Sequence, residues 1–498
     1  MAKSKCRRAP VAFARHLKTT GEGRIKRIHP IQSARIAHGS CFVDLSCVNL
    51  SVNGGLKAIK NDSVEVEKIT TVISMDCDNQ KLYRLSTYEI FVKYAGQSLK
   101  GTIISSAILY FSIPVLSRFY EASSFGTMQT IQNFSSILMV IATMRLDLAV
   151  LQAPRSELPK LFVAGTLISI VVASLVGCLI AVLSQAHSSF YHGLGHSVWL
   201  LPIYILVVGV TQIATNMAIR EENLKLIALA KVAQSVTFPS AALLLGLLWP
   251  LTLPLVVADL IGRSSLLLTL LRNKLHLLRE PLSIPWLTTK TILSQYRRFL
   301  YITTPGSVIS ATCSNSIILL ITARYGASAA GLYVLIDRLI GMPSMILSSA
   351  MSQAYTAILA DGQYNNREKS ELIRKIVLRN ILIITLPFAV LFTFNTEFVS
   401  LVAGPKWINA AHYLRCLIGM YFITFLTLPF NTTLYVRNLL KYQSIIDVSQ
   451  FAILTLFWGW VFYSSAPIEH ALIGISLIIS ASAITQATLS YRVTSRAT

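Results

Sequence analysis

The stretch YGASAAGLYVLIDRLIGMPSMILSSAMSQAYTAILA, residues 325–360, decides the fold of this chain. It is long and apolar enough to cross a membrane as a helix, and its Gly-rich opening predicts a turn. Asp337 and Arg338 lie about one third of the way along it. Each would cost on the order of 2.5 to 3.5 kcal/mol if it faced lipid, so we expect both side chains to face the protein interior.

An earlier stretch matches the start of this one without a gap. Residues 120–126 (YEASSFG) agree with residues 325–331 (YGASAAG) at Tyr, Ala, Ser and Gly. In both places an apolar segment ends in Arg and a second one follows, which predicts two copies of one membrane unit. A chance match is the alternative, because short apolar stretches often resemble one another.

The composition excludes a soluble globular protein. Of the 498 residues 53% are hydrophobic and only 13% are charged, so the chain is predicted to be a polytopic membrane protein. The formal net charge of +22 comes largely from loops, where Lys and Arg orient a chain against a membrane, so we expect no nucleic-acid partner. The seven cysteines show no metal-binding spacing, and we expect no metal and no cofactor.

Twelve apolar segments are long enough to span a membrane, which predicts an all-α polytopic membrane protein. They lie near residues 98–117, 127–144, 160–183, 198–218, 228–247, 251–271, 299–322, 329–356, 377–396, 411–434, 443–464 and 470–490.

Basic residues favour one side of these segments. Twenty Lys and Arg lie in alternate loops and at the C-terminus, against only Arg118, Arg324 and Lys406 on the other side. Since cytoplasmic loops carry the excess of positive charge, both termini are predicted to be cytoplasmic.

The longest loop between segments divides the chain into equal halves. We expect an N-terminal lobe of six helices at 98–271, a cytoplasmic linker at 272–298, a second six-helix lobe at 299–490 and a cytoplasmic tail at 491–498. Halves with an even number of spans enter from the same side, so the repeat is parallel and the substrate site is expected between the lobes. Residues 1–97 are interpreted either as a basic cytoplasmic extension that touches anionic lipid or as sequence upstream of a true start near Met75.

Polar side chains recur at three- and four-residue steps within several segments and form stripes on single helix faces. Helix packing is the alternative interpretation, because small and hydroxylated residues also let membrane helices approach closely. The candidate cavity stripe comprises Gln132, Ser136, Thr143, Thr303, Ser307, Ser314, Asp337, Ser344 and Ser348.

Four arginines are the candidate cations of such a cavity: Arg145, Arg263, Arg338 and Arg415. Arg263 has a second interpretation, since it follows Asp259 by one helical turn and predicts a local ion pair. Asp337 and Arg338 are adjacent and point about 100° apart, so each needs another partner or a wet cavity. Guanidinium groups beside hydroxyl and amide groups suit an anionic, hydroxylated ligand such as a sugar diphosphate.

Three motifs together resemble the polysaccharide flippases, the O-antigen and capsule-type translocases of the multidrug/oligosaccharidyl-lipid/polysaccharide exporter superfamily. The first runs from Tyr120 to Gly126, with its span ending in MRLDLA at residues 144–149. The second covers residues 331–343, and the third is GPKWINA at residues 404–410. The resemblance extends from about Ser98 to the end of the chain.

This resemblance implies a V-shaped carrier that moves an undecaprenyl-diphosphate-linked oligosaccharide repeat unit across the bacterial inner membrane by alternating access, for O-antigen, capsule or exopolysaccharide synthesis. It implies lumenal arginines on the diphosphate, a polyprenyl tail left in lipid, and no enzymatic activity. Lipid-linked oligosaccharide, membrane lipids, a polysaccharide polymerase and chain-length proteins are the implied partners.

Two other functions remain open from the sequence. A cation-coupled multidrug antiporter of the same superfamily would be expected to carry an acidic residue in its first or seventh span, and residues 98–117 and 300–322 contain none. A membrane polymerase or acyltransferase would need a catalytic group in a sizeable outward loop, and no nucleophile, base and orienting group converge in these short loops.

Overall fold

A computed structural model describes residues 101–185, 195–272, 286–344, 352, 366–427 and 440–496 of the chain. The chain divides into two units, Met1–Gln80 and Lys81–Thr498, and every described residue belongs to the second. The predicted N-terminal extension, Ser348 and about half of the predicted linker (273–285) lie outside the described residues.

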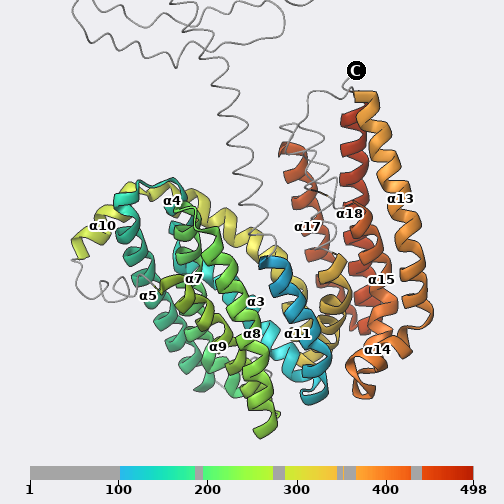
Figure 1. The fold of residues 1–498 in the computed structure, drawn as a ribbon, viewed down its shortest axis with the longest axis horizontal. Helices are drawn as coiled ribbons and strands as arrows, with labels where there is room; N and C mark the ends of the chain where they lie inside the picture. Colours follow the sequence, from blue (N-terminus) through green and yellow to red (C-terminus); the bar gives the residue numbers. More distant parts are fainter. Residues whose placement is uncertain are drawn as a thin grey trace, which may run out of the picture. The chain divides into compact units, whose positions relative to one another are not determined.

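The regular structure of the described residues is helical and includes no strand, which confirms the all-α fold class (Figure 1). The helices before the linker are Gly101–Phe119, α3 (Ala122–Thr143), α4 (Leu146–Gln152), α5 (Leu158–Gln185), α7 (Leu201–Arg220), α8 (Leu224–Leu248) and α9 (Thr252–Leu271). Those after it are α10 (Trp286–Gln295), α11 (Thr304–Ile336), α13 (Asn366–Thr393), α14 (Asn395–Ala403), α15 (Ala410–Thr427), α17 (Leu440–Ser464) and α18 (Ile468–Arg496). Short 3-10 turns lie at Arg155–Glu157, Gly195–Leu200 and Pro405–Trp407, and π-helical turns at Phe299–Thr303 and η8 (Asp337–Gly341).

Local sequence explains where several helices begin and end. Asn223 caps α8 by accepting a hydrogen bond from the backbone N–H of Leu226 (3.3 Å). Pro202 stands in the first turn of α7, where its missing N–H costs nothing. Gly404 follows α14 with a φ of 99°, a conformation that a side chain would strain.

Nine helices of the described chain are long and apolar enough to cross a membrane, or up to eleven if each of two bent pairs is one span. The bent pairs correct two predicted spans: α3 continues past a 58° bend into α4, and the C-terminal part of α13 continues past an 86° bend into α14. The run Phe299–Ser344 covers one predicted span and the start of the next. The count of twelve stays a prediction.

The predicted turn at the start of residues 325–360 is confined to one residue. Gly326 has a φ of 85° and interrupts α11, whereas residues 327–331 are helical, as are residues 122–126 of the matching stretch. Ala and Ser are compatible with a helix, so only the glycine with positive φ breaks it.

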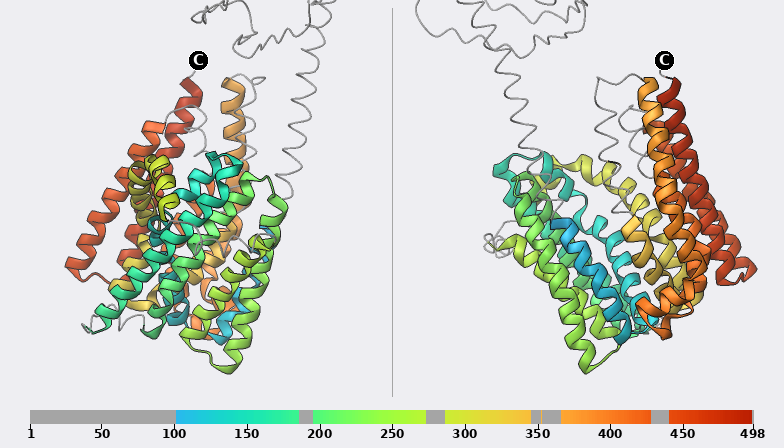
Figure 2. Two further views of the ribbon diagram at one scale, coloured as in Figure 1. Left: turned by 90° about the vertical axis from the view of Figure 1, so that its left-hand side faces the viewer. Right: turned by 45° about the vertical axis from the view of Figure 1, so that its right-hand side comes forward.

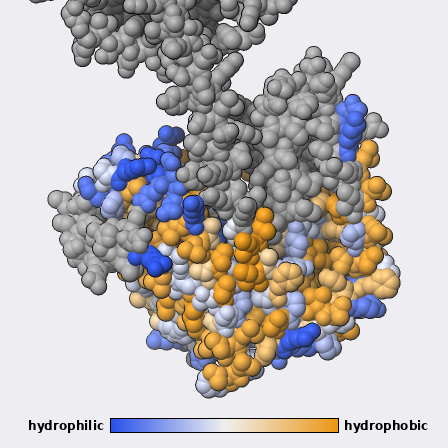
Figure 3. Space-filling model, in the orientation of Figure 1, coloured by the Kyte–Doolittle hydropathy of each residue, from blue (hydrophilic) through white to orange (hydrophobic). Residues whose placement is uncertain are grey.

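Large apolar side chains cover much of the outside of the helices. Phe111, Leu382 and Leu456 are each more than two-thirds exposed. Figure 3 shows hydrophobic residues over much of the coloured part of this face, while hydrophilic ones gather around α4 and α10. Exposed apolar patches of this extent are expected where helices contact lipid.

The two copies of the repeated stretch pack directly against each other. α3 and α11 form the most extensive contact between helices of the described chain. A Cβ built on Gly126 would overlap the carbonyl oxygen of Ala327, and one built on Gly331 would overlap that of Ala122. Ala122 and Ala327 occupy matching positions of the two copies, as do Gly126 and Gly331, so the contact is reciprocal.

The tyrosine that opens each copy also makes the same kind of bond in both halves. The Tyr120 hydroxyl donates to the carbonyl oxygen of Ala242 in α8 (2.8 Å), and the Tyr325 hydroxyl donates to that of Ala466, just after α17 (2.8 Å). These acceptors lie on or beside the fifth and eleventh predicted spans, which correspond in a repeat of six. The reciprocal contact and the matching tyrosine bonds support the prediction of two copies of one unit.

The C-terminal end of the helix Gly101–Phe119 and the turn Pro405–Trp407 meet beside this contact, and both are predicted to lie on the same side of the membrane (Figure 2). The indole N–H of Trp407 donates to the Ser117 carbonyl (2.7 Å), and Lys406 donates to the Arg118 carbonyl (2.8 Å). Trp407 is almost fully buried and packs edge-on against Phe125, with ring centroids 5.4 Å apart.

Replacing Trp407 by alanine should lower stability by about 3 to 5 kcal/mol, because it removes a buried ring and its hydrogen bond together. The matched control is Trp460→Ala, since Trp460 is 51% exposed and should change stability by about 0.5 kcal/mol or less. The fraction of protein that stays folded after heating in detergent measures both. Equal losses of folded protein for the two variants would contradict the stabilising contribution of Trp407.

Candidate functional site

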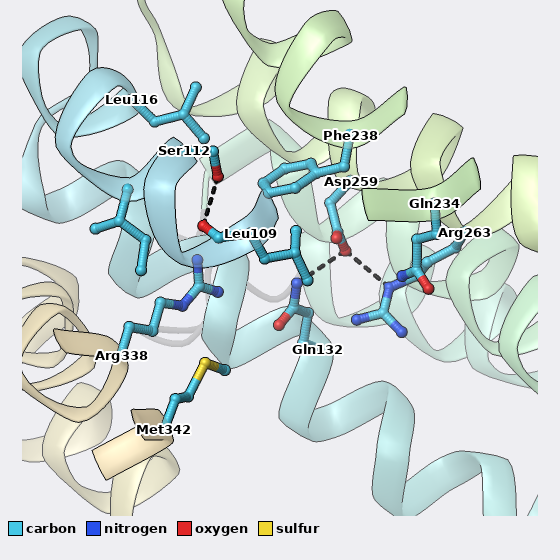
Figure 4. Close-up of a pocket in the computed structure, with 11 residues that line it drawn as sticks. Leu109, Ser112, Leu116, Gln132, Gln234, Phe238, Asp259, Arg263, Arg338 and Met342 are labelled. Carbon is cyan, nitrogen blue, oxygen red and sulfur yellow. Dashed lines mark hydrogen bonds and ion pairs between the residues drawn. The ribbon is translucent and has the colours of Figure 1, made fainter. Parts of the chain in front are cut away.

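A cavity of about 190 Å³, lined by both apolar and polar side chains, lies where helices from both halves of the chain meet (Figure 4). The helix Gly101–Phe119, α3, α8 and α9 contribute residues from before the linker, and η8 and the residue after it contribute from the second half. Its lining residues are Leu109, Ser112, Ile113, Leu116, Gln132, Gln234, Phe238, Asp259, Arg263, Arg338 and Met342.

On one wall, the carboxylate of Asp259 collects three donors at a single oxygen. Its Oδ2 accepts hydrogen bonds from Gln132 (2.8 Å), from Arg263 Nε (2.8 Å) and from the Tyr204 hydroxyl. Asp259 is 4% exposed and Tyr204 is fully buried. The three donors satisfy this oxygen, and the ion pair with Arg263 predicted from the i,i+4 spacing is confirmed.

On the facing wall, Arg338 enters the cavity from η8. Its Nη2 donates to Oε1 of Gln129 in α3 (3.0 Å), and its guanidinium lies over the Phe125 ring at 5.8 Å. Among the described residues it forms no ion pair. Its charge is therefore offset by neutral groups and by carboxylates beyond contact distance, and it is available to an anion.

The reciprocal glycine contact lies close to the cavity side chains along the chain. Gln132 lies six residues after Gly126 in α3, and Arg338 lies seven residues after Gly331. The tight approach of α3 and α11 therefore lies within two helical turns of these side chains. Thr130 and Thr322 bridge the same helices through a hydrogen bond between their hydroxyls (2.8 Å).

Three of the predicted site residues, Gln132, Arg263 and Arg338, line this cavity. Asp337, although adjacent to Arg338, accepts a hydrogen bond from the Tyr421 hydroxyl (3.0 Å). The other described candidates are not among the lining residues; they are Arg145, Arg415, Ser136, Thr143, Thr303, Ser307, Ser314 and Ser344.

The positions of these other candidates have local explanations. Arg145 lies at the bend between α3 and α4, 3.6 Å from Asp147, which also accepts a hydrogen bond from Thr143. Ser136 and Ser314 bond to carbonyls of their own helices, at 2.8 and 3.0 Å. Hydroxyls satisfied in this way are typical of membrane helices.

Sequence reasoning missed Gln234, Gln129 and Tyr204. Gln234 is the one amide within its predicted span (228–247), and a lone amide in an apolar segment was the signal available. Gln129 and Tyr204 gave no such signal, because their roles depend on side chains of other helices.

The family model described as polysaccharide biosynthesis protein matches residues 115–412, more than half of the chain. The chain belongs to the polysaccharide biosynthesis protein family. The resemblance found in the sequence is thereby confirmed at the level of the family.

Solved structures show the fold. A lipid II flippase, MurJ, in an inward closed conformation is 11% identical, with a TM-score of 0.57 over 81% of this chain and 87% of the other. An inward-facing multidrug resistance MATE family transporter of the MOP superfamily is 13% identical, with a TM-score of 0.52 over 80% and 94%. A Pyrococcus furiosus MOP superfamily transporter, whose structure is described by a binding pocket of reverse polarity, is 13% identical, with a TM-score of 0.50 over 81% and 96%.

A search of curated protein sequences found no match. Together, the comparisons and the long apolar helices describe a multi-pass membrane protein of the polysaccharide biosynthesis protein family, with a fold like that of a MATE transporter and a lipid II flippase.

Proposed function

We propose that this family member is a flippase that moves undecaprenyl-diphosphate-linked oligosaccharide repeat units from the cytoplasmic to the outer leaflet of a bacterial inner membrane. The observation that carries the proposal is Arg338, a cation directed into a cavity between helices of both halves and without an ion-pair partner in the described chain. A buried cation is costly in a membrane protein, and an anionic substrate offsets that cost.

The cavity chemistry supports a sugar diphosphate as the ligand. A guanidinium group binds phosphate oxygens through paired N–H donors, and Arg338 shares the cavity with a second guanidinium, that of Arg263. The amides of Gln132 and Gln234 suit sugar hydroxyls, while the polyprenyl tail stays in the surrounding lipid.

In this proposal the halves rock about the site and expose it alternately to each side, with both chain termini in the cytoplasm. The transported unit is then used by a polysaccharide polymerase and its chain-length partners. The reaction is transport, and no covalent step is assigned to the chain.

A cation-coupled drug antiporter is the second candidate, and Asp259 is the observation that favours it. A carboxylate in a transporter cavity is able to bind a coupling ion. In this structure, however, Arg263, Gln132 and Tyr204 already occupy one oxygen of Asp259, and the neighbouring arginines repel a cationic drug. The balance of charge therefore favours the flippase.

The deciding experiment deletes the gene and analyses the lipid-linked oligosaccharides. We expect complete diphosphate-linked repeat units to accumulate on the cytoplasmic leaflet and surface polysaccharide to be lost, because synthesis continues while translocation stops. In parallel, the gene is expressed in a pump-deficient host, and the susceptibility of that host to cationic dyes is measured. Normal surface polysaccharide in the deletion strain, together with protection of the expressing host against dyes, would support the antiporter instead.

A further inference from the structure

We propose that Asp259 acts as an internal competitor of the substrate: it binds Arg263 while the cavity is empty and yields that guanidinium to the diphosphate. The inference rests on the proposed function and assigns a role to a residue within the same cavity. Asp259 is thus a specificity and release residue, which sets how tightly the diphosphate is held.

The first support is the way Asp259 is fixed. Three donors, from α3, α7 and α9, converge on Oδ2, so the carboxylate keeps its place when one of them leaves. Gln132 and Tyr204 remain as donors after Arg263 is released. An ionised carboxylate with two remaining hydrogen bonds is a stable product of the exchange.

The second support is the geometry of Arg263. Its bond to Asp259 uses Nε, so the terminal amino groups Nη1 and Nη2 are not part of that bond. The side chain is 25% exposed and lines the cavity. Its guanidinium also lies over the ring of Tyr204, 5.5 Å from the centroid. A phosphate is therefore able to bind Nη1 and Nη2 before the bond through Nε is broken.

The third support is the charge of the lining. Arg263 and Arg338 carry two positive charges and Asp259 one negative charge, and among the described residues no other side chain of the lining is ionisable. A diphosphate diester carries two negative charges, so it matches the two arginines only if Asp259 no longer neutralises one of them. With Asp259 in place the match is incomplete, which weakens binding and permits release.

Incomplete matching is useful to a transporter. A substrate must bind strongly enough to enter and weakly enough to leave, and a fully neutralising cation pair would retain the diphosphate. Asp259 replaces the departing phosphate at Arg263 and so lowers the cost of release. We therefore expect its removal to tighten binding and to slow transport.

The test measures binding of a short polyprenyl diphosphate sugar, the glucosyl diester of geranyl diphosphate, to the full-length protein in lipid nanodiscs by calorimetry. This diester carries two negative charges, like the proposed substrate. Asp259→Asn should bind this probe about tenfold more tightly than the wild type, a change of about 1.4 kcal/mol, while transport in cells decreases. The matched control is Asp447→Asn in α17, where the carboxylate accepts hydrogen bonds from Gln443 and Gln486 outside the cavity. It removes the same charge and should leave affinity unchanged.

Affinity of Asp259→Asn equal to or weaker than that of the wild type would overturn the inference, as would an equal gain for Asp447→Asn. If Asp259→Asn does not fold, Arg263→Gln is compared with the double variant Arg263→Gln/Asp259→Asn. The double variant should bind more tightly because it lacks the unpaired carboxylate, and equal affinities would likewise overturn the inference.

Failure of the inference and failure of the proposed function are distinguishable. If the wild type binds the geranyl diphosphate diester, Arg338→Ala weakens binding and Asp259→Asn does not tighten it, only the competitor role of Asp259 is contradicted. If the wild type does not bind the probe, or if Arg338→Ala binds it normally, the proposed diphosphate site is contradicted. The competitor role of Asp259 is then contradicted as well, because it depends on that site.

Discussion

Replacing Arg338 by alanine is expected to reduce transport about 10- to 100-fold, the largest effect of any single side chain in the cavity. A charge-assisted hydrogen bond contributes about 1.5 to 3 kcal/mol, and Arg338 is the lining cation without a carboxylate in contact within the described chain. Diphosphate-linked repeat units should accumulate while the protein remains at normal abundance. Lipid extraction and surface polysaccharide staining measure the two sides of this result.

Three further variants sharpen the test. Arg338→Lys keeps the charge but lacks the paired donors, so its transport should fall between those of the wild type and Arg338→Ala. Arg155→Ala removes an exposed arginine outside the cavity and should transport normally. Arg415→Ala should lose less than Arg338→Ala, since Arg415 is exposed on α15. Normal polysaccharide in Arg338→Ala would contradict the site.

The repeated stretch was predictable from the sequence, but the packing of its two copies was not. The matching stretches at Tyr120 and Tyr325 predicted two copies of one unit, because short identities at a fixed offset are visible in a sequence. Their mutual contact was not predictable. It depends on Gly126 and Gly331 approaching the backbone of the opposite helix, and a glycine in an apolar segment is equally compatible with a turn.

The residues of the cavity were likewise predictable only in part. Arg338 was predictable because a lone guanidinium in an apolar segment must find a polar environment, and the bond between Asp259 and Arg263 followed from one helical turn of spacing. The partners that fix these groups, Gln129 and Tyr204, lie on other helices. Sequence periodicity reports which residues share a face, and only the packing of helices determines which faces meet.

Replacing Gly331 by alanine is expected to abolish most transport while leaving the protein folded. The new Cβ would overlap the carbonyl oxygen of Ala122, a backbone atom that cannot rotate away, so α3 and α11 must separate. Overpacking of this kind costs about 1 to 3 kcal/mol, which reduces the population of the closed arrangement about 5- to 150-fold. Gly126→Ala should act in the same way, since it would meet Ala327 in the reciprocal contact.

Separation of α3 and α11 is measurable as the accessibility of a residue that lies between them. In a variant without natural cysteines, a cysteine at Thr322, which faces Thr130 across the contact, should react faster with a membrane-impermeant maleimide when Gly331 is alanine. Gly459→Ala is the matched control, because a Cβ there would meet no atom within 4 Å. Alanine also favours a helix over glycine by about 1 kcal/mol, so loss of helix stability cannot account for a defect in Gly331→Ala. Unchanged reactivity with normal transport would show that the two glycines permit close packing but do not close the cavity.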